Sequence, residues 1–144
     1  MKLLVSEVLQ KVSNAKTKAD KVKLLRQYNT NALRSILIAS YDESAECLLP
    51  EGEVPYTAND SPKGEEHTYL EREFRQLRLF YKGGATGLTP LRREALFIQL
   101  IEGLHADEAE VVCLAKDKSL NKKYRITRQV IEEAFPQIVW GKRS

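Results

Sequence analysis

A basic stretch near the carboxyl end of the chain holds the residues best suited to chemistry. Between residues 116 and 128, the sequence KDKSLNKKYRITR places six cations against a single acid. Lys and Arg neutralise phosphate, and a Thr hydroxyl or the backbone N–H groups at a helix start can bond to its oxygens. The stretch therefore predicts a phosphate-binding site, with Tyr124 as an aromatic side chain among the cations. The residues expected to bind are Lys116, Lys118, Lys122, Lys123, Arg125, Thr127 and Arg128.

A solubilising surface loop explains the same charge pattern equally well. A second basic set surrounds residues 11–23 and contains Lys11, Lys16, Lys18, Lys21 and Lys23. These lysines do not share one helical face, so an ordinary helix surface is the favoured interpretation of this set.

A glycine-rich turn, KGGATG at residues 82–87, is the third candidate. Gly83 and Gly84 allow the backbone to approach a ligand closely, and their amides are suited to contact a phosphate. Closing the preceding helix is the simpler explanation, and we favour it.

Catalytic constellations are missing from the sequence. No glycine motif has the spacing that cradles a nucleotide phosphate, and His67 and His105 have no second ligand at metal-binding spacing. Cys113 has no His nearby in sequence and falls on an apolar helical face, which favours core packing over nucleophilic catalysis. We therefore expect no catalytic residue, no metal site, no cofactor and no enzymatic activity.

The charge of the chain is distributed unevenly. The net charge is +3, but residues 1–41 carry +6 and residues 42–66 carry −7. A molecule polarised in this way can bind a polyanion with one surface and repel it with another. The acidic segment at about 50–66 contains three Pro and is predicted to be a loop, with Val54 and Tyr56 as hints of a docking segment.

The remaining sequence predicts a single all-α domain over residues 1–144, a compact bundle of about seven or eight helices. Apolar residues recur at helical spacing, and no sustained alternation predicts a sheet. The helices are expected near residues 4–12, 18–28, 31–37, 42–49, 66–82, 90–101, 107–116 and 128–135. Thr17, Asn31, Thr89 and Thr127 are the expected N-caps. Residues 95–101 are apolar on nearly every side, which predicts a helix at the centre of the bundle.

Length and composition bound the class of protein. The 144 residues are 42% hydrophobic and 30% charged, which is typical of one globular domain. No apolar run approaches the roughly 20 residues of a membrane span, and Ser6-Glu7 interrupts the first apolar residues too early for a signal peptide. Two cysteines in apolar helical surroundings favour a reducing compartment. These features predict a cytoplasmic protein that does not bind membranes.

Two parts of the chain resemble the all-helical DNA-binding domain at the start of phage-type ATP-dependent DNA ligases. The first part is LVSEVLQ at 4–10, KTKADKVKLL at 16–25 and NALRSIL at 31–37. The second is FIQLIEGL at 97–104, ADEAEVVCLAKD at 106–117, and the segment from 126 to 136 that ends in AFP. The resemblance implies contact with a duplex across its minor groove. It also makes Lys16, Lys18, Gly83 and Gly84 second-rank contacts.

The chain departs from the ligases in what it lacks. The adenylation motif Lys-x-Asp-Gly is missing, since Lys116-Asp117-Lys118 has the wrong spacing and no Gly. The Cys-Gly pair of the ligase turn is replaced by LNKKY at 120–124, which adds positive charge. The whole chain, including LPEG at 49–52 and EHT at 66–68, also resembles a small protein family of T4-like phages. That resemblance implies a viral protein in a bacterial cytoplasm and supplies no activity.

Together these features predict non-catalytic binding of double-stranded DNA through the phosphate backbone, in the service of phage DNA metabolism. The alternative hypothesis is a protein-interaction adaptor. It would use the acidic segment at 50–66 to dock a host or phage replication, transcription or virion protein, with the helical bundle as a scaffold.

Overall fold

Apart from one isolated bridge, helices make up the regular secondary structure of the residues that the structure describes. The computed structural model describes residues 3–52, 54–56, 68–84 and 87–141, and within these ranges the all-α prediction is confirmed. No described helix is both long and apolar enough to cross a membrane. The elements are α1 (Val5–Asn14), α2 (Lys18–Gln27), α3 (Asn31–Tyr41), α4 (Leu70–Glu73), the 3₁₀-helix η1 (Phe74–Phe80), α5 (Pro90–Gly103), α6 (Ala106–Lys116), α7 (Leu120–Lys123) and α8 (Arg128–Ala134).

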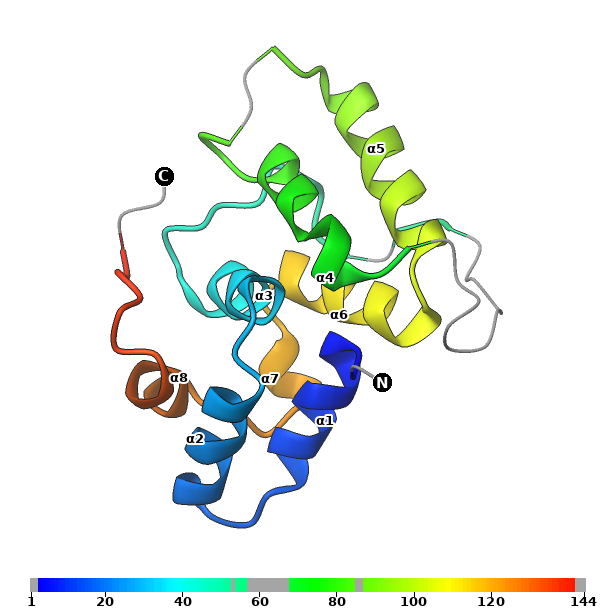
Figure 1. Cartoon of the computed structure of the whole chain (residues 1–144). Helices are drawn as coiled ribbons and strands as arrows, with labels where there is room; N and C mark the ends of the chain where they lie inside the picture. Colours follow the sequence, from blue (N-terminus) through cyan, green and yellow to red (C-terminus); the bar gives the residue numbers. More distant parts are fainter. Residues whose placement is uncertain (1–2, 53, 57–67, 85–86, 142–144) are drawn as a thin grey trace.

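The helices form two groups on either side of a central pair (Figure 1). Helices α3 and α6 pack against each other at the centre, with α1, α2, α7 and α8 below them and η1 and α5 above in this view. The prediction that residues 95–101 occupy the centre is wrong, because α5 buries only Phe97, Leu100 and Ile101. Helix α6 takes that place, since its small and β-branched residues allow α1, α3, α5 and α7 to approach it closely.

Threonine hydroxyls begin four of the helices. Thr17, Thr89 and Thr127 each accept a hydrogen bond from the backbone N–H three residues later, which confirms these three predicted N-caps. The fourth predicted cap is displaced by one residue. Thr30, and not Asn31, caps α3, because its hydroxyl accepts from the Leu33 N–H at 3.1 Å.

The helix predicted at 42–49 does not form. The segment is extended, and Cys47 forms an isolated antiparallel bridge with Tyr81. The Leu48 N–H donates to the Phe80 carbonyl at 2.8 Å on one side of the bridge. A turn starts the segment, because the Asp42 carboxylate accepts from the Ser44 N–H and hydroxyl. Local side-chain bonds of this kind compete with helix formation.

The long helix predicted at 66–82 is shorter and tighter than expected. Residues 66 and 67 lie outside the described residues, and the rest forms the single turn α4 followed by η1. In a 3₁₀-helix, side chains three residues apart share a face. Phe74, Leu77 and Phe80 have this spacing, and Leu77 and Phe80 are buried. Gly83, with φ of 85°, then turns the chain away.

A buried carboxylate on α6 joins the starts of two other helices. Glu108 on α6 is 1% exposed and accepts hydrogen bonds from the backbone N–H groups of Val5 and Leu70, both at 3.0 Å. These groups lie at the starts of α1 and α4, where N–H groups have no partner within the helix. Glu108 therefore fixes the first turns of both helices to the central α6.

Candidate nucleic-acid interface

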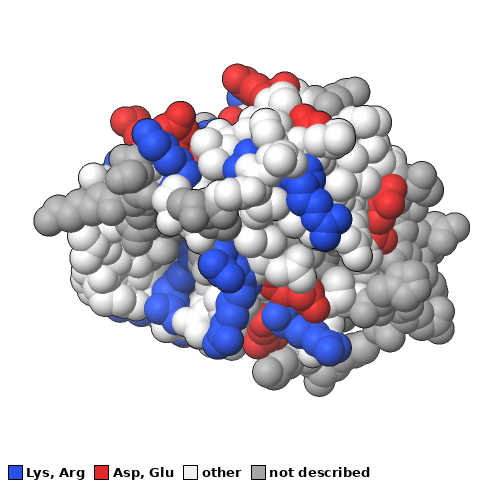
Figure 2. Space-filling model, turned by 90° about the horizontal axis from the view of Figure 1, so that it is seen from above, with Lys and Arg blue, Asp and Glu red and all other residues white. Residues whose placement is uncertain are grey.

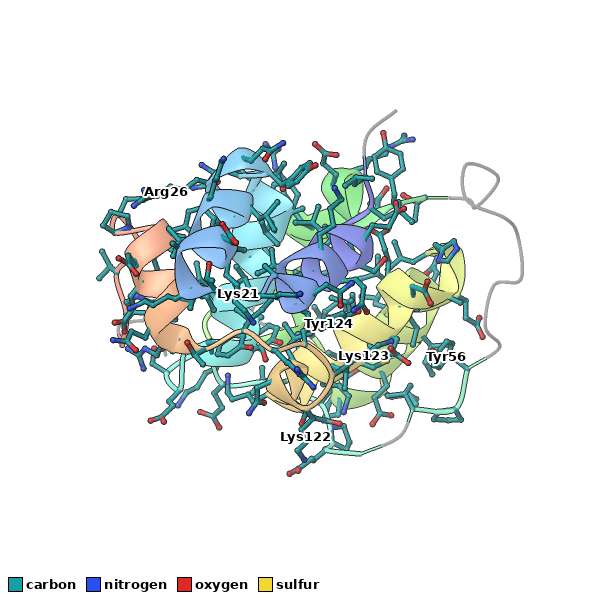
Figure 3. All side chains as sticks on the ribbon, turned by 90° about the horizontal axis from the view of Figure 1, so that it is seen from below. Lys21, Arg26, Tyr56, Lys122, Lys123 and Tyr124 are labelled. Atoms are coloured by element: carbon teal, nitrogen blue, oxygen red, sulfur yellow. The ribbon has the colours of Figure 1, made fainter. Side chains whose placement is uncertain are left out.

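Two basic sets that lie about a hundred residues apart in sequence meet on one face of the protein. The turn between α1 and α2 carries Lys16, the first turns of α2 carry Lys21, and the segment from α7 to α8 carries Lys123 and Arg125. The Lys21 ammonium donates to the Arg125 carbonyl, and the Arg125 N–H donates to the Ser13 hydroxyl at 2.8 Å. Figure 3 shows this face from below, with Lys21 and Lys123 on the two sides.

Contacts between α2 and α8 hold the two sides together. The Arg26 guanidinium, at the end of α2, donates to the carbonyls of Glu133 and Ala134 at 2.8 and 3.3 Å. Lys18, at the start of α2, forms an ion pair with the Glu133 carboxylate at 3.2 Å. A cation at the carboxyl end of a helix satisfies free carbonyls and favours the helix dipole. Arg26 therefore serves the fold.

Buried side chains fix the segment between α7 and α8. Tyr124 and Ile126 are each 2% exposed and belong to the core, while Arg125 between them faces solvent. The Tyr41 hydroxyl donates to the Ile126 carbonyl at 2.6 Å. Tyr124 is therefore a core residue, and the Lys123 ammonium lies 5.6 Å from the centre of its ring. Tyr124 is the anchor that turns Arg125 outward.

A polar cleft of about 750 Å³ opens between the two sides. Lys16, Lys21, Lys123 and Arg125 line it, so four cations from distant parts of the chain converge there. The other lining residues are Gln10, Ser13, Asn14 and Ala15, so no acidic side chain is among those that line it. A cleft lined by cations and by no acidic side chain concentrates positive potential and attracts anions.

Acidic neighbours offset part of the charge at the edge of the cleft. Glu110 accepts a hydrogen bond from the Lys123 ammonium and thereby raises the pKa of Lys123 above its usual value. Arg128 pairs with Glu132 at 2.9 Å and lies 4.5 Å from the centre of the Trp140 ring. Both cations are exposed and are held in place by these contacts. Lys122 is also exposed, on the solvent side of α7 (Figure 3).

Lys116 does not belong to this surface, contrary to the prediction. Its side chain is buried, and the ammonium donates to the carbonyls of Pro50 and Gly52 at 2.7 and 3.0 Å and to the Asp117 carboxylate at 2.6 Å. An ammonium has three protons to donate, and these three acceptors match them. Lys116 therefore holds the segment after Pro50 against α6 and is not available to a phosphate.

Lys118 is also bound within the fold, in contrast to the prediction that its ammonium faces a phosphate. Its ammonium donates to the carbonyls of Ala39, Asp42 and Ala45 at 2.9, 2.9 and 2.7 Å. Burial lowers the pKa of Lys118, because partial removal from water disfavours the charged form. Lys118 adopts φ of 53°, a left-handed conformation that aims its side chain at the end of α3. It joins this helix to the extended segment that follows.

The glycine turn lies away from the cleft. In Figure 1 the chain after η1 is in the upper part of the molecule, whereas α2 and α7 are in the lower part. A Cβ atom on Gly84 would lie 1.9 Å from the Arg78 carbonyl oxygen, so close packing of the turn requires glycine there. Gly83 supplies the positive φ. The structure thus gives Gly83 and Gly84 a role in the fold and separates them from the other candidate residues.

Thr127 lies beside the basic surface, with its side-chain oxygen committed to the fold. The hydroxyl accepts from the Val130 N–H at 3.4 Å as the cap of α8. The resemblance makes Lys16 and Lys18 second-rank contacts with DNA. Lys16 lies on the turn before α2 and lines the cleft, and Lys18 is the first residue of α2. For Lys21 the sequence favours an ordinary helix surface, whereas in the structure this side chain lines the cleft and donates to the Arg125 carbonyl. No signal in the sequence marks it, because its contact with Arg125 is tertiary.

The face seen from above has a different charge pattern. Figure 2 shows Lys and Arg side chains separated by uncharged surface and by acidic side chains. Ion pairs also occur away from the cleft, as between Lys82 and Glu46 at 3.8 Å. Exposed arginines on η1 and α5, among them Arg75 and Arg92, belong to the upper part of the molecule.

The first residues of the acidic segment are part of the fold. Val54 and Pro55 line a small pocket of about 140 Å³ with Phe97, and Tyr56 packs against the core. Val54 and Tyr56 are thus engaged within the protein and do not form a free docking motif. Residues 57–66 lie outside the described residues, so the adaptor hypothesis remains a prediction.

The two cysteines and the acidic side chains are the other groups in the described part of the chain that could do chemistry. Burial raises the pKa of the Cys113 thiol to about 11 and raises that of Cys47 in the same direction. Both thiols are therefore protonated, and poorly nucleophilic, near neutral pH. Across the described residues, no three His, Cys, Asp or Glu side chains come together as metal ligands would.

One family model matches the chain. It covers residues 8–122, and its description is a family of unknown function, DUF6433. The chain belongs to this family. No curated protein and no solved structure matches it. The matched residues include Lys16 and Lys21 on one side of the cleft and end at Lys122, just before Lys123 and Arg125 on the other side.

Proposed function

We propose that this protein of the DUF6433 family binds double-stranded DNA through its phosphate backbone and does not act as an enzyme. The basic surface that we propose as the contact consists of Lys16, Lys18, Lys21, Lys122, Lys123, Arg125 and Arg128. Lys116 and Lys118 are left out of it because their ammonium groups are bound to carbonyls within the protein.

The observation that carries the proposal is the meeting of two separate basic sets around one cleft. Four cations line that cleft, and no acid is among its lining residues. On the face seen from above, by contrast, cations and acids are mixed (Figure 2). Glu110 pairs with Lys123 but does not line the cleft. Lys and Arg on a concave polar surface provide the contacts that position a protein on a phosphate backbone without reading its sequence.

The resemblance to the ligase DNA-binding domain supports the same proposal. In that resemblance, the turn at Lys16 and Lys18 and the turn after α6 are the DNA-contacting parts. The first turn and the later residues of the second segment, from Lys122 onward, belong to the basic surface, although Lys116, Lys118 and the glycine turn do not. We therefore propose a stand-alone domain of this kind, which would follow the backbone along the minor groove in phage DNA metabolism.

A salt titration of DNA binding tests the proposal. Fluorescence anisotropy would measure the dissociation constant for an intact duplex, a nicked duplex and a single strand over a range of salt concentrations. Backbone binding predicts weak dependence on sequence and an affinity that falls steeply with salt, by about 0.9 log units per log unit of salt for each phosphate contacted.

A double charge reversal locates the contact. Lys122→Glu with Lys123→Glu should abolish retention of the duplex while far-ultraviolet circular dichroism stays unchanged. Arg75→Glu with Arg92→Glu makes the same change of charge on exposed residues of the upper part and should leave binding intact. Binding of the Lys122 and Lys123 variant at the wild-type level would overturn the assignment of this surface.

A separate experiment distinguishes the adaptor hypothesis. Neutral substitutions Asp60→Asn, Glu65→Gln and Glu66→Gln remove acids of the 50–66 segment and spare Pro50 and Gly52, which hold Lys116. If the substituted protein no longer captures a partner protein but still binds the duplex, the result supports the adaptor hypothesis. If duplex binding alone responds to the substitutions, the acidic segment acts on DNA.

A further inference from the structure

The cleft differs from an ordinary basic surface because its cations face one another. Lys16 and Lys21 come from the turn after α1 and the first turns of α2, and Lys123 and Arg125 come from the end of α7 and the loop that follows it. A duplex backbone that runs over a surface contacts cations set side by side. Cations that converge on one volume from two walls can contact the backbone in the same way, and they can also enclose a single anionic group that enters between the walls.

The two walls are fixed to each other before any ligand binds. The Arg125 N–H donates to the Ser13 hydroxyl at 2.8 Å, and the Arg125 carbonyl accepts from the Lys21 ammonium. Tyr124, buried beside it, keeps the backbone of Arg125 in place. A site whose walls are already linked loses little conformational entropy when a ligand enters, which favours tight and selective binding.

Ion pairs engage only some of the cations on this face. Outside the cleft, Lys18 is paired with Glu133 and Arg128 with Glu132. At the cleft, Lys123 is paired with Glu110 and the Lys21 ammonium donates to the Arg125 carbonyl. The side chains of Lys16 and Arg125, which also line it, have no acidic partner in the described part of the chain. A guanidinium offers five N–H donors in a planar fork, and a lysine ammonium offers three donors. The cleft thus supplies more donors than one internal phosphate diester can use.

We propose that the cleft binds a terminal phosphate, a phosphate monoester with three free oxygens, as found at a strand end or on a free nucleotide. A monoester carries close to two negative charges near neutral pH, and a diester carries only one, with two of its oxygens bound to sugars. The volume of about 750 Å³ is of the size that holds a nucleotide-like ligand. In its strand-end form, the inference rests on the proposed DNA binding and adds a preference for ends.

Three DNA molecules of equal duplex length test the preference. They are a hairpin with a 5′-phosphate at its single end, the same hairpin with a 5′-hydroxyl, and a closed dumbbell without ends. The phosphorylated hairpin should bind about tenfold more tightly than the other two, the equivalent of one added charge-assisted hydrogen bond. Equal affinity for all three would overturn the inference and would leave duplex binding itself intact.

Matched variants assign the preference to the cleft. Lys16→Gln and Arg125→Gln should each reduce the ratio of affinities between the phosphorylated and hydroxyl hairpins towards one. Lys23→Gln removes one charge from an exposed residue of α2 that does not line the cleft, and it should keep the ratio. A preference that persists in the Arg125 variant would also overturn the assignment.

A nucleotide arm separates the two sources of the phosphate. Adenosine monophosphate and inorganic phosphate would be titrated while the backbone amide signals of Lys16 and Arg125 are followed by NMR. If the hairpins do not bind but either compound shifts these signals, the cleft takes a free nucleotide and the proposed DNA binding fails. If the hairpins and both compounds all fail to bind, the inference fails as well.

Discussion

Lys118 provides a sharp test of the distinction between structural and DNA-facing lysines. The sequence places it in the same basic stretch as Lys122, yet only Lys118 has its ammonium enclosed by three carbonyl oxygens. Lys118→Met keeps most of the length of the side chain and removes the three donors. The expected result is a less stable protein that, once folded, binds DNA as before.

The magnitude follows from the contacts. Hydrogen bonds from a charged donor contribute roughly 1.5–3 kcal/mol each, and the recovery of the ammonium's hydration offsets much of this when the group is only partly buried. We therefore expect Lys118→Met to lower the free energy of unfolding by about 2–4 kcal/mol, which is a large part of the stability of a small domain. Lys122→Met, on an exposed residue, should change it by less than about 0.5 kcal/mol.

Urea denaturation followed by circular dichroism measures both variants, and the dependence of the free energy on urea should be the same as in the wild type. Duplex affinity is then measured well below the urea midpoint, where each variant is folded. If Lys118→Met unfolds at the wild-type urea concentration but loses duplex affinity, Lys118 reaches phosphate and its assignment as a structural residue is wrong.

Two further predictions concern acidic side chains that accept hydrogen bonds within the protein. Glu108→Ala should lower the free energy of unfolding by about 3 kcal/mol or more, because it leaves the buried N–H groups of Val5 and Leu70 without an acceptor. Urea denaturation measures this loss, and a value below about 1 kcal/mol would contradict the prediction. Glu110→Gln should lower the pKa of Lys123 towards its usual value, because the hydrogen bond from Lys123 to the carboxylate is the main cause of the raised pKa; NMR of the lysine side chain measures the shift, and an unchanged pKa would refute this cause.

Local signals in the sequence predict much of the fold. Three of the four expected caps are correct because a Thr hydroxyl needs only the N–H three residues later, which is local information. The extended segment at 42–49 could not be predicted in the same way. Its carbonyls at Asp42 and Ala45 are taken by Lys118, about 75 residues away in sequence, and a contact of that range leaves no periodic pattern.

The candidate site could be predicted only in part for the same reason. Charge located the basic stretch but did not separate Lys116 and Lys118, whose partners are distant carbonyls, from Lys122 and Lys123. The cleft itself depends on Lys21 meeting Arg125 across 104 positions of sequence. Pairing of α2 with α8 brings them together, and no spacing within either helix predicts that pairing.

The most direct test of DNA backbone binding at the cleft is the salt dependence of duplex affinity. It is compared between two double variants, each of which replaces two cations with neutral residues. Lys16→Gln with Arg125→Gln should make the slope of log affinity against log salt shallower by about 1.8, which corresponds to two lost phosphate contacts. Arg75→Gln with Arg92→Gln should leave the slope unchanged. If both pairs change the slope equally, or if neither does, DNA does not bind at this cleft.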